Sequence, residues 1–209
     1  FALVCAGLLS GAALASTPEE AIRPIQDQWA EIKYRVPEKQ QAERYHALAE
    51  QARQLASTQP PGQAETLIWQ GIALSSEAGA KGGLGALSIA KAAKQQLEAA
   101  IKLDDKALKG SAYTSLGTLY FKVPGWPIGF GDNTRAEELL KKALTINPAG
   151  IDPNYFYADY LAERARYAES LRHLETALKA PARPGRELAD AGRRQEIQAL
   201  IAKVKKDME

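Results

Sequence analysis

The chain has 209 residues, of which 45% are hydrophobic and 25% are charged. This length suits one domain or one repeat array, and the hydrophobic content allows a sizeable core. The 27 basic and 25 acidic residues leave a net charge of +2. Because no basic run with interleaved aromatic residues accompanies that balance, we expect no nucleic-acid partner.

Residues 1–15 make up almost all of the uncharged segment FALVCAGLLSGAALAS, which ends in the A-x-A pattern of a cleavage site before Ser16. We interpret it as the later part of a secretory signal peptide whose charged start precedes Phe1. The alternative interpretation is a short buried or frayed helix. Its glycines, serine and short length disfavour a membrane span.

The single cysteine, Cys5, falls inside this segment, so the mature chain would hold no thiol and no disulfide. A lipoprotein needs a cysteine after a small residue, directly behind the apolar run. Cys5 instead follows Val4 and comes early. We therefore expect a periplasmic, exported protein that is soluble after cleavage and not lipid-anchored.

Residues 16–60 predict an N-terminal helix pair, at 18–35 and 38–57. The break falls at Val36-Pro37, because the residue before a proline avoids the helical conformation. Apolar residues recur on one face of the second helix, and the segment STQPPGQ then reads as a loop.

Residues 61–182 predict three hairpins of the tetratricopeptide-repeat (TPR) kind. In the middle unit, the segments AYTSLGTLY and RAEELLKKALTINP match the first-helix pattern W-x2-L-G-x2-Y and the spacing of the second helix. Small residues let the paired helices approach, and proline ends the second helix. The matching residues are Tyr113, Leu116, Gly117, Tyr120, Ala136, Leu140, Ala143 and Pro148.

The same spacing recurs on both sides of this unit. Downstream, Ala143 and Ala177 are 34 residues apart, which is the TPR period. Upstream, the distance from Ala100 to Ala143 is nine residues too long. The flanking units are carried by Leu67, Gly71, Leu74, Ala93, Leu97 and Ala100, and by Ala158, Leu161, Ser170, Leu174 and Ala177.

The excess length lies in the turns of the first two hairpins, in EAGAKGGLGALSI and VPGWPIGFGDN. Because equivalent turns of a solenoid line up along one edge, we expect these two insertions to be neighbours in space.

Residues 183–209 predict a C-terminal capping helix over 186–206, after the loop APARPGRE. Its apolar stripe would lie on the last repeat, and its basic face, which carries Arg193 and Arg194, would lie in water. We see no convincing period-two alternation. The predicted fold is therefore an all-α, TPR-like right-handed solenoid of helical hairpins.

No constellation for catalysis is recognisable in the sequence. GAKGGLG lacks the Gly-Lys-Ser/Thr ending of a phosphate-binding loop, and His46 and His173 have no neighbours at metal-ligand spacing. We therefore expect a non-enzymatic protein with no catalytic residues, no metal and no cofactor.

Binding is the function that the helical register favours. Tyr155, Asp159 and Glu163 are expected to face the concave groove of the third unit, and Phe121 that of the second, where they would meet a protein partner or an extended ligand. Trp126 lies in the insertion beside the groove, where it either contacts a partner or staples the loop to the core.

A second hypothesis is a carrier of a small hydrophobic ligand. In that case the two insertions would close over an apolar cavity. Its expected wall consists of Trp69, Phe121, Trp126, Phe130 and Tyr155.

The order IWQGIALSSEAGAKGGLGAL, LEAAIKLDD and LYFKVPGWPIGFGDNTRAEELLKKALTINP resembles the TatT-type T-component family of TRAP transporters, over roughly residues 60–180. The resemblance implies a non-enzymatic periplasmic protein of TPR-like hairpins that binds the transporter's solute-binding protein. It also implies a pore or cleft for small hydrophobic ligands, with a homo-oligomer as an open alternative.

Overall fold

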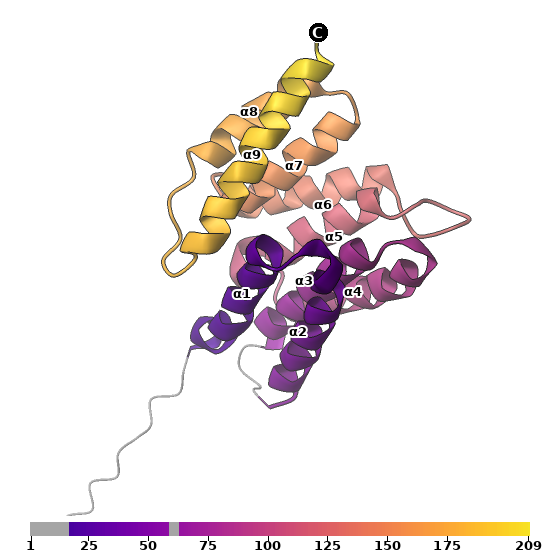
Figure 1. Ribbon diagram of the computed structural model, residues 1–209, viewed down its shortest axis with the longest axis vertical. Coiled ribbons are helices and arrows are strands. Elements are labelled where there is room, and N and C mark those ends of the chain that lie inside the picture. The colour runs from indigo at the N-terminus through magenta and orange to yellow at the C-terminus, as the bar shows by residue number, and fades with distance from the viewer. Residues whose placement is uncertain (1–16, 59–62) are drawn as a thin grey trace, which may run out of the picture.

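The structure, a computed structural model, describes residues 17–58 and 63–209. The expected signal peptide, with Cys5, lies outside the described residues. Within them the fold is all-α, as predicted, and the only strand-like feature is an isolated bridge between Gly125 and Gly131. In chain order (Figure 1) the helices are α1 (Pro18–Arg35), α2 (Glu38–Thr58), α3 (Gln63–Lys81), α4 (Gly83–Leu103), the short 3-10 helix η1 (Ala107–Gly110), α5 (Ser111–Lys122), α6 (Asn133–Ile146), α7 (Ile151–Glu163), α8 (Tyr167–Leu178) and α9 (Glu187–Asp207).

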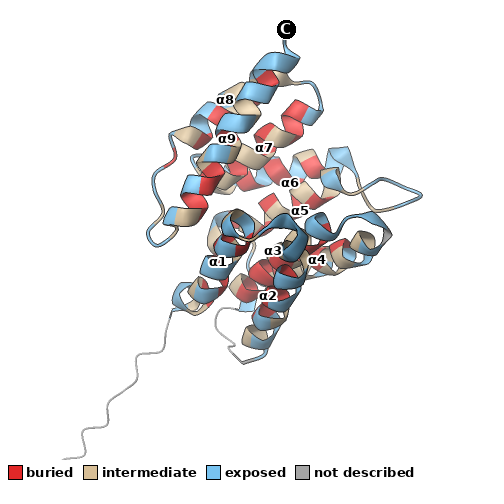
Figure 2. Ribbon diagram, viewed as in Figure 1, coloured by how far each residue is buried: buried red, intermediate tan, exposed pale blue. Residues whose placement is uncertain are grey.

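The pairs α3/α4, α5/α6 and α7/α8 pack as successive hairpins in a solenoid-like array. Close approach depends on the small residues of the repeat pattern. A Cβ atom on Gly71 would lie 2.6 Å from Cγ of Leu97, and one on Gly117 would lie 2.8 Å from Cγ of Leu140. In the third hairpin the hydroxyl of Ser170 donates to the carbonyl of Ala158 at 2.8 Å. Figure 2 shows buried residues where the helices face one another.

Helix α1 starts at a capping box, in which Thr17 and Glu20 each accept a hydrogen bond from the other's backbone N–H. It ends at Arg35, and α2 begins at Glu38, which agrees with the predicted break. The two helices are not the closest neighbours, however. Helix α2 packs most closely on α3, where its buried face contacts Trp69 and Ala73.

The first predicted insertion is not a loop. Helix α3 continues to Lys81, and α4 begins at Gly83, so the extra residues add turns to both helices. Only the junction is irregular, where Gly82 and Gly83 adopt φ values of 60° and 63° in the left-handed region. The expectation of an irregular segment was wrong because an Ala- and Leu-rich stretch still propagates a helix despite its glycines.

The second insertion does form a loop, between α5 and α6, and it projects from the body in Figure 1. Backbone hydrogen bonds hold its base, from Gly131 N–H to the carbonyl of Pro124 and from Asp132 N–H to the carbonyl of Tyr120. A Cβ atom on Gly129 would lie 3.2 Å from Leu87 of α4. The two lengthened segments are therefore neighbours, as the repeat alignment predicted.

Helix α9 does more than cap the last hairpin, because it also contacts α1. The ring of Tyr34 packs on Gly192, where a Cβ atom would lie 2.3 Å away. Lys33 forms an ion pair with Glu196 at 3.3 Å. Arg193, which we expected to face water, is only 6% exposed, because α1 and α7 cover that face of α9. The first and last helices thus close the array into a ring.

Candidate functional site

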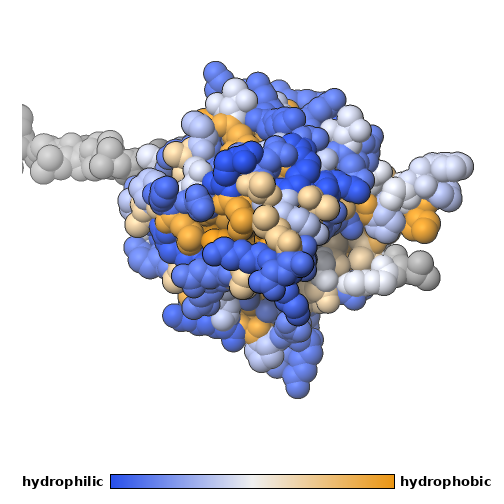
Figure 3. Space-filling view, turned by 90° about the horizontal axis from the view of Figure 1, so that it is seen from above, coloured by the Kyte–Doolittle hydropathy of each residue, from blue (hydrophilic) through white to orange (hydrophobic). Residues whose placement is uncertain are grey.

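A cavity of about 1410 Å³, which is partly open to solvent, lies inside this ring. Its wall is built from residues of α1, α2, α3, α4, α5, α7 and α9, together with η1 and the segments before α7 and α9. Both lengthened segments border it. The first contributes Gly79, Ala80, Gly82, Gly83, Ala86 and Leu87, and the second contributes Val123, Pro124 and Ile128. In Figure 3 a hydrophobic area lies between hydrophilic surfaces on one face of the molecule.

The apolar part of the wall centres on two tryptophans. The rings of Trp29 and Trp69 meet edge to face, with their centroids 6.1 Å apart. The indole Nε1 of Trp29 donates to the hydroxyl of Ser76 at 2.9 Å, which fixes that ring. Further apolar surface comes from Ile72, Ala86, Leu87, Ala90, Leu119 and Phe156.

A network of ion pairs forms another part of the wall, next to the tryptophans, since the ring of Trp29 meets that of Tyr34 at 6.1 Å. Asp152 of α7 accepts from Arg183 at 2.6 Å and from Arg193 of α9 at 2.8 Å. Burial by itself would raise the pKa of Asp152, but the two guanidinium groups outweigh it and hold that pKa well below its usual range. Arg193 also pairs with Glu196, which accepts a hydrogen bond from the hydroxyl of Tyr34.

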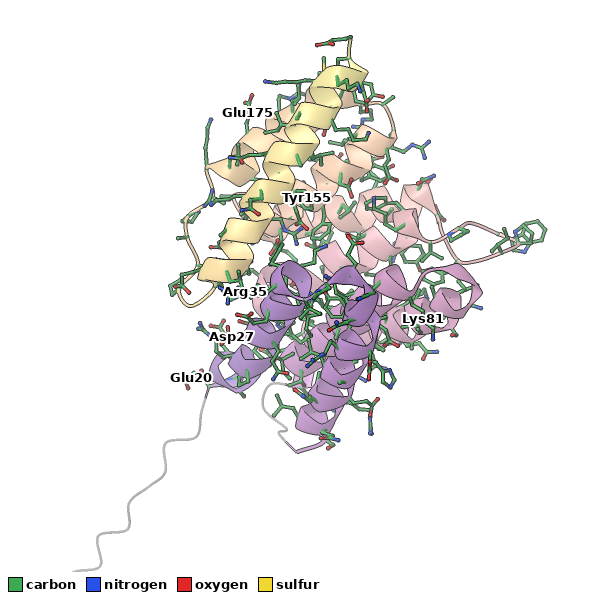
Figure 4. The ribbon with its side chains drawn as sticks, viewed as in Figure 1. Glu20, Asp27, Arg35, Lys81, Tyr155 and Glu175 are labelled. Carbon is green, nitrogen blue, oxygen red and sulfur yellow. The ribbon has the colours of Figure 1, made fainter. Side chains whose placement is uncertain are left out.

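Tyr155 lies beside this network, at the centre of the molecule in Figure 4. The Arg193 guanidinium stacks over its ring at 4.4 Å. Burial raises the pKa of Tyr155 to about 12, although Arg193 acts in the opposite direction. The phenol is therefore neutral throughout the physiological range, and it can serve as a hydrogen-bonding group.

Two buried polar atoms in the wall have no hydrogen-bond partner among the described residues. They are the indole Nε1 of Trp69 and the hydroxyl of Tyr45. Trp69 is 5% exposed and Tyr45 is 1% exposed. Burying such a group without a partner costs about 1–3 kcal/mol. Both residues line the cavity through other atoms, whereas the two unpartnered atoms are enclosed by the protein, so they are a cost of the packed core and not contacts for a bound molecule.

Of the seven expected site residues, two line the cavity and five do not. Trp69 and Tyr155 line the cavity. Asp159 and Glu163 do not line it, but both form ion pairs with Lys122, which does. Burial lowers the pKa of Lys122, but Asp159 and Glu163 outweigh this effect and raise it above the usual value.

The other three expected residues lie outside the cavity wall. Phe121 points to the far side of α5, where its ring meets Tyr160 at 5.6 Å. Phe130 folds back on Tyr120, also at 5.6 Å, and packs against the core under the loop. Trp126 is 90% exposed, so it does not staple the loop. Whether one of these side chains faces the cavity depends on the exact register of its helix or on the path of its loop.

The sequence analysis did not assign Arg183, Arg186 and Arg193 to a site, although all three line the cavity. The other basic residues in its wall are Arg23, Lys33, Lys109 and Lys122. A useful signal was available in Gly192, since a glycine inside a helix often marks close packing. It indicates that this side of α9 meets another element, and Arg193 is its direct neighbour.

The described residues offer no support for a metal centre. Within 17–58 and 63–209, no group of three or more His, Cys, Asp or Glu side chains is placed to hold a metal ion. His46 contacts Glu77, and His173 contacts Asn154. No helix in this part of the chain is long and apolar enough to cross a bilayer.

No known family model matches this chain, and no curated protein matches it in sequence. Function must therefore be inferred from the fold and from the chemistry of the cavity.

Proposed function

We propose that this chain is a non-enzymatic, TPR-like binding protein whose central cavity holds a small ligand with an apolar body. The observation that carries the proposal is the cavity of about 1410 Å³, with Trp29 and Trp69 in its wall. Ligand sites are typically concave and largely apolar, with a few polar groups that fix orientation and volumes of roughly 300–1000 Å³, so this cavity is larger than a typical site.

The TPR-like assignment rests on the repeated helix contact. Gly71 faces Leu97 and Gly117 faces Leu140 at equivalent positions of successive hairpins. This is the geometry that the first-helix glycine of the repeat permits.

A filled-cavity variant tests the ligand proposal. Ser115 of α5 lines the cavity and is half-buried, so Ser115→Trp would place an indole in the ligand space. We expect it to weaken binding of the uncharged apolar dye N-phenyl-1-naphthylamine at least about tenfold. The matched control is Ala202→Trp, at an exposed position on α9 outside the cavity wall. Equal dye binding by both variants would contradict the proposal.

A second candidate is an exported protein that engages a solute-binding protein, as the resemblance to the T-component family implies. The observation that favours it is the tip of the projecting loop, where Trp126 is 90% and Ile128 is 67% exposed. Large apolar side chains held out in water are typical of interaction sites.

The test for this candidate is a pull-down from periplasmic extract with wild type and the Trp126→Ala, Ile128→Ala double variant. A solute-binding protein that the wild type captures and the variant loses supports the second candidate. Capture that the variant retains argues against the loop as the contact.

A further inference from the structure

Arg186 differs from the other arginines of the cavity wall. It lies in the segment before α9, and its guanidinium group sits 5.2 Å from the centre of the Trp69 ring. Arg183 and Arg193 are held in ion pairs with Asp152, and Arg23 donates to the carbonyl of Pro184 at 3.1 Å. In the described part of the chain, no carboxylate forms an ion pair with Arg186, and no acceptor takes a hydrogen bond from its guanidinium group.

The acids near Arg186 do not neutralise it by contact. Asp152 and Asp190 are engaged by Arg183, and Asp27 is an exposed residue of α1 that lies outside the cavity wall (Figure 4). Burial, followed by repulsion from Arg183, lowers the pKa of Arg186 below its usual value in spite of these three acids. The cation is thus left under-compensated at the edge of the cavity.

The Trp69 ring over which this cation lies is part of the apolar wall of the cavity. A guanidinium group without a carboxylate partner, beside an apolar wall, is complementary to an anionic oxygen head with an apolar tail.

We propose that the cavity takes a monocarboxylate with an alkyl chain, with its carboxylate at Arg186 and its chain along Ile72, Ala86 and Leu87. The proposal rests on the proposed ligand-binding function and narrows it to one class of ligand. It commits to an anion, and so it predicts discrimination against uncharged and cationic molecules with the same chain.

Isothermal titration calorimetry of the full 209-residue chain tests this, with decanoate, 1-decanol and decyltrimethylammonium below their aggregation concentrations. We expect decanoate to bind at least about tenfold more tightly than decanol, since a charge-assisted hydrogen bond is the difference between them. Arg186→Gln should remove this preference and leave decanol binding within about twofold. Arg172→Gln, at an exposed site on α8, is the control and should keep the preference.

The outcomes of these titrations distinguish the carboxylate inference from the proposed ligand-binding function of the cavity. Equal affinity for decanoate and decanol, or a preference that survives Arg186→Gln, would overturn the carboxylate inference and leave the apolar cavity in place. A preference for the cationic probe would also overturn it. If none of the three molecules binds, both the inference and the proposed cavity function fall.

Discussion

Gly71 and Gly117 occupy equivalent places in two hairpins, and each faces the leucine of its partner helix at a distance that excludes a side chain. Gly79 lies in the same helix as Gly71, yet a Cβ atom there would meet nothing within 4 Å. Gly71 and Gly117 therefore allow close packing of two helices, whereas Gly79 has no such packing role and only makes its helix less stable.

Gly117→Ala should lower the free energy of unfolding by about 1–2 kcal/mol, because the clash with Leu140 outweighs the gain in helix propensity. Gly79→Ala is the matched control, and it should raise that free energy by about 0.5–1 kcal/mol. Urea titrations of both variants measure the two effects. A stabilising Gly117→Ala would show that α5 and α6 can separate at no cost.

Helix α9 is held against its neighbours partly by charged side chains that it buries. Arg193 is buried between α7 and α9, where it pairs with Asp152 and Glu196 and stacks on Tyr155 and Phe156. A buried charge in such a network holds elements together only while all its partners are present.

Arg193→Leu should therefore lower the free energy of unfolding by about 3 kcal/mol, because it leaves Asp152 and Glu196 without their shared cation. The control is Arg172→Leu on the exposed face of α8, for which we expect a change of less than about 0.5 kcal/mol. Chemical denaturation followed by circular dichroism measures both. A mild effect of Arg193→Leu would mean that α9 docks through its apolar stripe alone.

The stability that the contact between α6 and the turn before α8 contributes is expected to depend on pH. Hydrogen bonds from Lys141, then from Arg166, lower the pKa of Glu137 from 4.5 to about 2. Since the folded pKa lies below the unfolded one, the stabilisation is complete above about pH 4.5 and is lost as the pH falls towards 2.

Glu137→Gln should accordingly destabilise the protein at pH 6, and the difference from the wild type should shrink by pH 2.5. Thermal melts at the two pH values provide the comparison. The same pair of measurements on Glu175→Gln, at an exposed site of α8 (Figure 4), controls for the substitution itself. A difference that is equal at both pH values would contradict the assignment of the effect to ionised Glu137.

At the scale of the whole molecule, the contact between α1 and α9 turns an open array into a ring. In an open solenoid each repeat is stabilised by its sequence neighbours only. Here Tyr34 of α1 contacts Glu196 and Gly192 of α9, near the other end of the chain. Lys33 forms an ion pair with Glu196, and Arg23 donates a hydrogen bond to the carbonyl of Pro184. The cavity exists because the ring is closed.

Tyr34→Ala should therefore increase amide hydrogen exchange in the first half of α9, although the two segments are far apart in sequence. Exchange in α6, which does not contact α1, should remain as in the wild type. Hydrogen–deuterium exchange with mass spectrometry resolves these segments. Faster exchange confined to α1 and α2 would indicate that α9 is held by α7 and α8 alone.

The local sequence is sufficient to predict the helices and the pairing within the three repeat hairpins, but it did not predict that α2 packs most closely on α3. The break at Val36-Pro37, the glycine at Gly117 and the proline at Pro148 act through neighbouring backbone, so their effects can be read within a few residues. The projecting loop at 124–131 follows in the same way from its prolines and glycines.

The cavity could not be predicted in this way, because it depends on contacts between residues far apart in the chain. The burial of Arg193 depends on how far the array curves before α9 meets α1, and each packing angle adds to that curvature. Trp126 and Phe130 are four residues apart, yet only Phe130 is covered, since the path of the loop decides which ring reaches the core. Periodicity in the sequence specifies the face of each helix, whereas the closure of the ring decides which faces enclose the ligand space.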